Sequence, residues 1–78
     1  MKFVEVRWVD AMRSDGWCVL AEAPHVVKCI TRGWLIREDD EQVILAGTTS
    51  GDGEFGEVIA IPRGMVTAME TLKIKVEV

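Results

Sequence analysis

The sequence predicts a mainly β protein: a small five-stranded, strongly bent antiparallel barrel with one short helical segment after the first strand. Short stretches in which apolar and polar residues alternate indicate strands that are buried on one face. Clusters of glycine, proline and acidic residues separate these stretches, as turns do. A glycine also interrupts the longest apolar stretch, which is typical of a strand that bends sharply. With 78 residues, the chain forms one domain over residues 1–78.

The first two strands are predicted over residues 3–9 and 26–37. The second is long and partly apolar on both faces, with Gly33 near its middle. A barrel needs such a bend where one strand contributes to both halves of the wall. The acidic residues 38–41 then form a solvated turn.

The connection between these strands carries the predicted helical segment, over residues 17–23. Ser14 or Asp15 can cap its start, and Pro24 ends it. A helix this short is not stable in isolation, so we expect it to dock on the barrel.

The remaining strands are predicted over residues 42–49, 56–61 and 66–78, the last as one strand or a strand pair. A glycine-containing turn at residues 50–53 and a tight connection at residues 62–64, with one 3₁₀ turn, join them. Strict alternation follows near the C-terminus, where the apolar positions are Leu72, Ile74, Val76 and Val78. Charged residues between them are typical of an edge strand.

Composition indicates self-association. Hydrophobic residues make up 49% of the chain, including three Trp and four Met. A domain of this size cannot easily bury so many large side chains, so we expect some of them at an interface between copies in a homo-oligomer. The net charge is −4 and no basic stripe is visible, which disfavours general nucleic-acid binding.

The cysteines and the start of the chain suggest a compartment. The first residues carry charge and lack the apolar run of a secretory leader, and no stretch approaches the roughly 20 apolar residues of a membrane span. We therefore expect a cytoplasmic protein with reduced thiols. Cys18 and Cys29 are predicted to pack as small buried hydrophobes.

Two motifs resemble those of Sm-like proteins, which have Src-homology-3-type barrels. Gly33-Trp34-Leu35 followed by the acidic turn is similar to the first Sm motif, and Ile61-Pro62-Arg63-Gly64 is similar to the second with one inserted proline. This resemblance implies the barrel. The asparagine with which Sm-like proteins hold a base is absent, because Val43-Ile44-Leu45 offers no polar equivalent. RNA binding in the Sm manner is therefore disfavoured.

Nearly the whole chain also resembles a group of small, mostly uncharacterised bacteriophage and prophage proteins. The residues that carry this resemblance are Val6-Arg7-Trp8-Val9-Asp10, Ser14-Asp15-Gly16-Trp17, residues 33–38 and Ile61-Pro62-Arg63-Gly64. The resemblance implies a phage accessory protein that acts in a bacterial cytoplasm.

No catalytic or metal-binding pattern emerges, so we expect a non-enzymatic protein without cofactor or metal. His25, the single histidine, lies in a predicted loop without a recognisable nucleophile motif. The spacing of Cys18, His25 and Cys29 matches no zinc pattern. The consecutive carboxylates at residues 38–41 lack the burial that separates pKa values in acid–base pairs.

The candidate binding residues are aromatic, acidic and arginine side chains in or near the first connection and the two motifs: Trp8, Asp10, Arg13, Asp15, Trp17, Arg32, Trp34 and Arg63. Recognition residues concentrate on loops, and Trp and Arg are frequent binding anchors. The alternatives are that Trp8 and Trp17 plug the barrel ends, that Asp10 or Asp15 caps a helix, and that Trp34 lies in the core or at a subunit interface.

Three functional hypotheses follow. The first is a self-associating binding module that engages a host protein. The second is an oligomer that sequesters a small nucleotide or signalling ligand between subunits, with Arg7, Arg32 or Arg63 on its phosphate and a Trp stacked on its base. The third, an Sm-like RNA binder, is disfavoured by the acidic charge and the missing asparagine.

Overall fold

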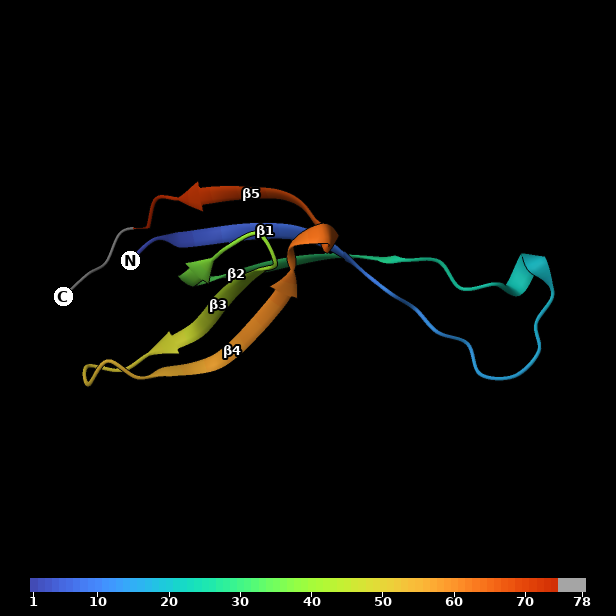
Figure 1. Ribbon diagram of the computed structural model, residues 1–78, viewed down its shortest axis with the longest axis horizontal. Coiled ribbons are helices and arrows are strands. Elements are labelled where there is room, and N and C mark those ends of the chain that lie inside the picture. The colour runs from blue at the N-terminus through green and yellow to red at the C-terminus, as the bar shows by residue number, and fades with distance from the viewer. Residues whose placement is uncertain (75–78) are drawn as a thin grey trace.

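The computed structural model describes residues 1–74 as one antiparallel sheet with a long projecting connection (Figure 1). The strands run in the spatial order β4-β3-β2-β1-β5, and each pairs with its neighbour in antiparallel register. The elements in chain order are β1 (Phe3–Asp10), η1 (Leu20–Glu22), β2 (Val27–Glu38), β3 (Gln42–Thr49), β4 (Phe55–Pro62), η2 (Arg63–Met65) and β5 (Val66–Leu72). The mainly β prediction with five strands is confirmed.

Strand β2 belongs to both halves of the sheet, as its central glycine predicts. Residues 27–34 pair with β1, whereas β3 pairs with β2 only from Trp34 onward. At Gly33 a Cβ atom would lie 2.8 Å from the main-chain oxygen of Ala46. A side chain at position 33 would require the main chain to shift, so glycine permits β2 and β3 to approach this closely.

The core lies on the inner face of the curved sheet. Its fully buried side chains come from three strands: Val4, Val6, Val43, Leu45 and Ile61. Alternation in β1 places Val4 and Val6 on this face, and partly buried residues such as Trp8, Leu35 and Met69 surround the cluster. The core is small for a chain with so many large apolar residues.

The predicted closure into a barrel is not seen within residues 1–74. Strands β4 and β5 are the two edges of the sheet and pair with β3 and β1, not with each other. Within the described residues the sheet is bent but open, because β4 and β5 each pair with one strand only. The Sm-like identity of the fold remains a prediction.

Local chemistry explains the connections inside the sheet. In the β2–β3 turn, Asp39 Oδ1 accepts hydrogen bonds from the main-chain N–H groups of Glu41 (2.8 Å) and Gln42 (3.0 Å). The predicted 3₁₀ turn after Pro62 is η2. Strand β5 is an edge strand, as predicted, but ends at Leu72. The expected continuation over Val76 and Val78 lies outside the described residues.

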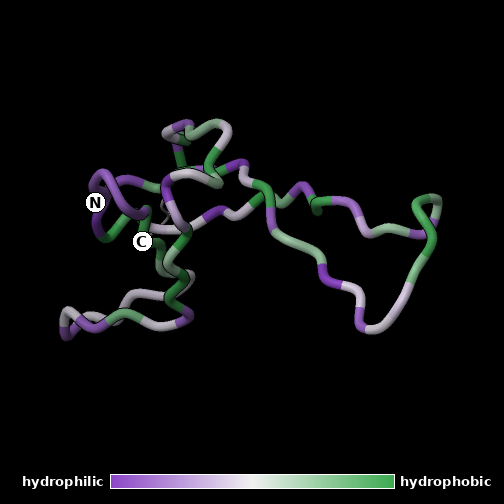
Figure 2. The backbone as a smooth tube through the Cα atoms, turned by 45° about the vertical axis from the view of Figure 1, so that its right-hand side comes forward, coloured by the Kyte–Doolittle hydropathy of each residue, from purple (hydrophilic) through white to green (hydrophobic). Residues whose placement is uncertain are grey.

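The first connection forms an arm, defined here as residues 11–26, that extends away from the sheet (Figure 1). The predicted helix over residues 17–23 is wrong in extent: only η1 is helical, and its N-cap residue, Val19, makes no side-chain capping bond. The expectation that this segment docks on the barrel is also wrong, since η1 lies at the far end of the arm with no buried residue. Figure 2 shows that this far end includes a hydrophobic stretch.

The arm makes the molecule unusually long for its size. The extents are 54 × 27 × 22 Å and the radius of gyration is 16.0 Å. A compact domain of this length has a radius of gyration of roughly 11.5 Å. The sheet therefore forms the compact part of the molecule, whereas the arm adds length and exposed surface.

Candidate functional site

The eight predicted binding residues do not form one site. Five of them, from Trp8 to Trp17, lie along the end of β1 and the first half of the arm. Arg32 and Trp34 lie on β2, and Arg63 begins η2. The structure distributes them over the arm, two pockets and two ion pairs, and each location supports a different role.

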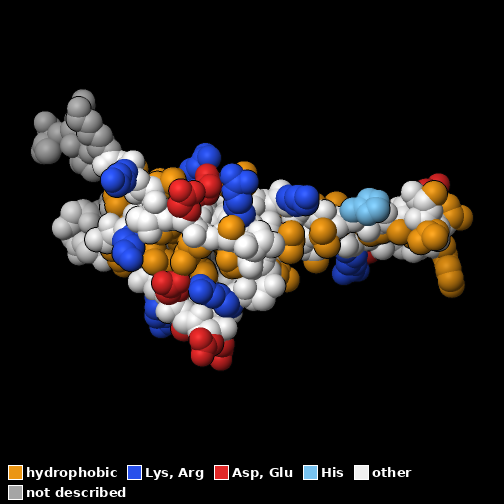
Figure 3. Space-filling model, turned by 90° about the horizontal axis from the view of Figure 1, so that it is seen from above, with side chains coloured by type: hydrophobic (Ala, Val, Ile, Leu, Met, Phe, Trp, Pro, Cys, Tyr) orange, Lys and Arg blue, Asp and Glu red, His pale blue; other side chains and the backbone are white. Residues whose placement is uncertain are grey.

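The arm displays apolar side chains to solvent. Every residue from Asp10 to Glu22 is exposed. The large apolar ones in the arm are Met12, Trp17, Val19, Leu20 and Val26. Trp17 is fully exposed and Leu20 is 92% exposed, so the hypothesis that Trp17 plugs a barrel end is wrong. Hydrophobic side chains cover the far end of the arm in Figure 3.

The polar residues of the arm do not cap a helix. Asp10 Oδ1 accepts a hydrogen bond from the neighbouring Ala11 N–H at 2.9 Å. Asp15 forms an exposed ion pair with Arg13, with 2.9 Å between Arg13 Nη2 and Asp15 Oδ1. These contacts are local, and an exposed pair of this kind stabilises little. Both capping predictions are wrong because the helical turn begins beyond these residues.

Trp8 lies where the arm meets the sheet. Its ring packs against the core, and its Nε1–H donates a hydrogen bond to Thr31 Oγ1 at 2.9 Å. Trp8 therefore has a packing role, as the alternative to a binding role predicts, although part of its side chain remains accessible. It also lines a pocket, so it anchors one side of an open surface.

This pocket, which we name the base pocket, has a volume of about 470 Å³. Its lining residues come from β1, β2 and β5: Arg7, Trp8, Val9, Lys28, Cys29, Ile30 and Thr67. The register explains the arrangement, because Arg7 faces Ile30 and Val9 faces Lys28 across the β1–β2 pair. A register shift in the β1–β5 pair at Arg7 and Trp8 lets the Thr67 hydroxyl donate to the Arg7 carbonyl oxygen at 3.1 Å.

The base pocket combines apolar walls with positive charge. Arg7 and Lys28 contribute cations, and no carboxylate lines the pocket in the described part of the chain. Sequence reasoning missed Lys28 and Ile30 as pocket residues. The signal was present in the alternation of β2, which places both on the same face, but the partner register with β1 was needed to locate the pocket.

Arg32 does not face this pocket as a free cation. Glu5, a carboxylate only 8% exposed, accepts from Arg32 Nε at 2.9 Å and pairs with Arg32 Nη2 at 2.8 Å. Arg7 Nε lies 3.5 Å from the other carboxylate oxygen. The hydrogen bond from Arg32 holds the pKa of Glu5 below its ordinary value, against the opposing effect of desolvation. Arg32 therefore has a structural role in this arrangement.

Arg63 is likewise engaged. Its Nη1 lies 3.1 Å from Glu38 Oε2, and its main-chain N–H donates to the Glu41 carbonyl oxygen at 2.8 Å. The hydrogen bond from Glu41 N–H lowers the pKa of Asp39 in the same turn. The second motif thus fastens η2 to the acidic turn. Of the three arginines expected to contact a phosphate, Arg7 is the one that lines the base pocket.

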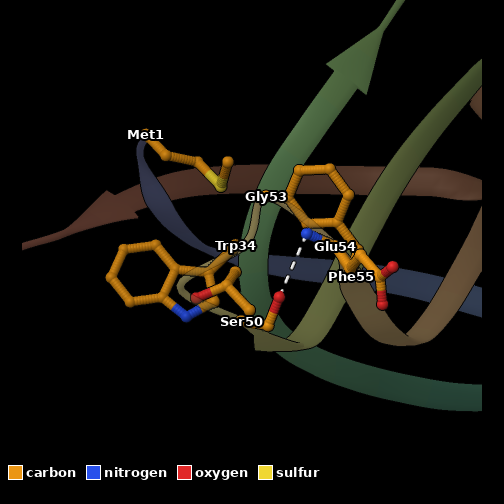
Figure 4. Close-up of a pocket in the computed structure, with 7 residues that line it drawn as sticks. Met1, Trp34, Ser50, Gly53, Glu54 and Phe55 are labelled. Carbon is orange, nitrogen blue, oxygen red and sulfur yellow. Dashed lines mark hydrogen bonds between the residues drawn. The ribbon is translucent and has the colours of Figure 1, made fainter.

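Trp34 contributes to a second pocket, which we name the hairpin pocket (Figure 4). It has a volume of about 330 Å³ and is lined by Met1, Trp34, Thr49, Ser50, Gly53, Glu54 and Phe55. Ser50 Oγ accepts a hydrogen bond from Glu54 N–H at 3.1 Å and so holds the β3–β4 turn beside the pocket. The ring of Phe3 meets Trp34 edge-on, with 5.1 Å between centroids. Trp34 is thus partly packed and partly available to a ligand.

The thiols differ from expectation. Both cysteines are free, but Cys18 is exposed on the arm, so its prediction as a buried hydrophobe is wrong. Cys29 is half-buried in the base pocket, and its Sγ lies 3.7 Å from the Val27 carbonyl oxygen. His25 is exposed on the arm, as predicted for a loop residue.

Neither a membrane-spanning helix, a metal site nor a known relative identifies a function for the described residues. No helix in residues 1–74 is long and apolar enough to cross a membrane. Within the same residues, no group of three or more His, Cys, Asp or Glu side chains is placed to hold a metal ion. No protein-family model, curated protein or solved structure matches the chain.

Proposed function

We propose that this protein is a non-enzymatic binding module that self-associates and engages a protein of a bacterial host, as an accessory protein of the phage type. The exposed apolar arm is the observation that carries this proposal. Trp17 and Leu20 contact solvent at the end of an extension that adds nothing to the core. Exposed aromatic and aliphatic side chains of this kind support binding to another protein.

The arrangement of polar groups supports a binding role rather than catalysis. The single histidine lies on the arm and lines neither pocket. The acidic turn uses Asp39 to organise its own main chain, and Glu38 pairs with Arg63. These contacts engage two of the consecutive carboxylates that would otherwise suggest acid–base chemistry.

Self-association is tested by sedimentation velocity from 1 to 100 μM. We expect an oligomer whose population rises with concentration, because burial of the exposed apolar side chains favours assembly. A single monomeric species over this range would contradict this half of the proposal.

The hairpin pocket is the proposed contact for the host protein, since Trp34 and Phe55 form its apolar wall beside the polar Ser50 and Glu54. We expect Trp34→Ala to lose proteins that the tagged wild-type chain retains from a bacterial lysate. Val58→Ser, which changes an exposed residue outside the pocket, is the matched control. Equal retention by the wild type and both variants would contradict this half of the proposal.

A small phosphate-bearing ligand is a second candidate, supported by Arg7 and Lys28, which share one face of the β1–β2 pair in the base pocket. Thermal unfolding with and without millimolar AMP tests it. A stabilisation that Lys28→Ala removes supports this ligand class, whereas an unchanged midpoint counts against it.

A further inference from the structure

The arm and the base pocket are complementary surfaces at opposite ends of the same extension. The far end of the arm presents Trp17 and Leu20 with the carboxylate of Glu22. The base pocket presents Val9 and Ile30 with the cationic residues Arg7 and Lys28, which the β1–β2 register places on one face of the sheet. Within residues 1–74, neither Glu22 nor Lys28 forms an ion pair.

In the observed arrangement, the far end of the arm of one chain cannot contact the base pocket of the same chain. The arm leaves the sheet beside the base pocket and carries its apolar far end away from it (Figures 1 and 3). Two copies can form this contact twice, once with each arm. In a two-fold dimer whose arms lie antiparallel, each far end reaches the base of the other arm, and every contact is repeated by symmetry.

The exposed area is large enough for such an interface. The chain exposes 6340 Å². A compact folded monomer of 8.7 kDa exposes roughly 4,700 Å², which leaves an excess of about 1,600 Å². A standard stable interface buries about 800 Å² on each partner. The excess on each chain is about twice the area that a standard interface buries per partner, so the exposed surface is sufficient for a stable dimer.

We propose that the base pocket is the docking site for the arm of a second copy of this chain. Trp17 and Leu20 of each copy enter the partner's base pocket, and Glu22 pairs with the partner's Lys28. This inference rests on the self-association in the proposed function and specifies its interface. The hairpin pocket, at the other end of the sheet, remains open for a different partner.

The native cysteines provide a direct test, because Cys18 belongs to the arm and Cys29 lines the base pocket. Mild oxidation of the wild-type protein is expected to give a dimer on a non-reducing gel. Mass spectrometry of its digest should show the Cys18 peptide joined to the Cys29 peptide. A dimer joined only through Cys18–Cys18 bonds, or a linkage confined to monomers, would contradict the antiparallel arrangement.

Mixed single-cysteine chains identify which two thiols meet between copies. Cys18→Ser retains only Cys29, and Cys29→Ser retains only Cys18, so neither chain alone can form the expected bond. An equimolar mixture is expected to form a heterodimer joined once through Cys18 and Cys29. Failure of the mixture to yield it, while both variants remain dimeric in solution, would overturn the proposal.

Charge exchange tests the polar contact. Glu22→Lys and Lys28→Glu are each expected to weaken the dimer about tenfold, because each places like charges together. The double variant should return to within about threefold of wild type by restoring opposite charges. Lys73→Glu changes an exposed lysine remote from the base pocket and is the control. Additive losses in the double variant would reject the Glu22–Lys28 contact.

Substitutions in the apolar contact distinguish docking of the arm from self-association in general. Trp17→Ser combined with Leu20→Ser is expected to weaken dimerisation by at least about 100-fold, since apolar anchors dominate such interfaces. Val58→Ser should leave it unchanged, and circular dichroism should show the β-sheet in both variants. A wild-type monomer at 100 μM defeats self-association itself. A dimer insensitive to the arm substitutions defeats only the docking of the arm.

Discussion

The sheet and the arm contain similar apolar residues, but the sheet buries them and the arm exposes them. Leu45 in β3 is buried in the core, whereas Leu20 in the arm is 92% exposed. Trp8 packs on the core and satisfies its indole N–H through Thr31, whereas Trp17 faces solvent. The difference teaches that apolar residues in the sheet build the core, while those in the arm stay exposed and are available for the interaction proposed above.

The largest expected effect compares the two leucines. Leu45→Ala should lower the free energy of unfolding by about 3 kcal/mol, because it removes a buried side chain and leaves a cavity. Leu20→Ala should change it by less than about 0.5 kcal/mol in dilute solution. Urea denaturation of both variants at submicromolar concentration measures the contrast. Equal losses would show that the arm is part of the folded core.

The bend of β2 gives the next effect. Gly33→Ala should destabilise the fold by about 2 kcal/mol, because the new Cβ would overlap the Ala46 carbonyl oxygen and the main chain must shift. Gly51→Ala is the matched control, since its Cβ position is open, with no atom from elsewhere in the described chain within 4 Å. Thermal and urea unfolding report the difference. A tolerant Gly33 would show that the bend does not depend on this close approach.

The two tryptophans give a smaller contrast. Trp8→Phe should cost about 1 kcal/mol of stability, since it deletes the N–H that Thr31 Oγ1 accepts and reduces packing. Trp17→Phe retains an exposed aromatic ring and should leave the stability of the dilute chain unchanged. Unfolding monitored by far-ultraviolet circular dichroism avoids the change in fluorescence. Similar losses in both variants would place Trp17 against the sheet.

The smallest effect concerns pH. The Arg32 hydrogen bond lowers the folded-state pKa of Glu5 below its ordinary value of 4.5. Its contribution is therefore present above about pH 4.5 and is lost as the pH falls through the folded-state pKa. Wild type should lose stability more steeply than Glu5→Gln between pH 5 and pH 3. Glu54→Gln is the control, and its slope should follow that of wild type; equal slopes for all three proteins would reject this role of Glu5.

Much of the sheet was predictable because its signals are local. Alternation located the strands, Gly33 indicated the bend, and Pro62-Arg63-Gly64 indicated the 3₁₀ turn. The extent of the helix and the burial of Cys18 were predicted wrongly. The helix was predicted from its capping residues and Pro24, and the burial of Cys18 from the usual environment of a free cysteine; neither signal reports whether the connection contacts the sheet.

The candidate site was predictable only in part. The Trp8–Trp17 segment was identified because aromatic and polar residues interrupt the strand pattern. The pairing of Arg32 with Glu5, the use of Arg63 in the acidic turn and the place of Lys28 in the base pocket were not predicted. Each depends on the register between strands, since a side chain's neighbours across a sheet are distant in sequence.

By itself, the sequence determined the mainly β class, the strand positions, the bend at Gly33 and the surplus of large apolar residues. Only the tertiary structure decided that the sheet stays open within residues 1–74, that the arm projects from it, and that a cationic pocket lies at the base of the arm. The physical reason is that periodicity and turn chemistry act over a few residues, whereas edge pairing, pockets and exposed surfaces arise from contacts between segments that the fold brings together.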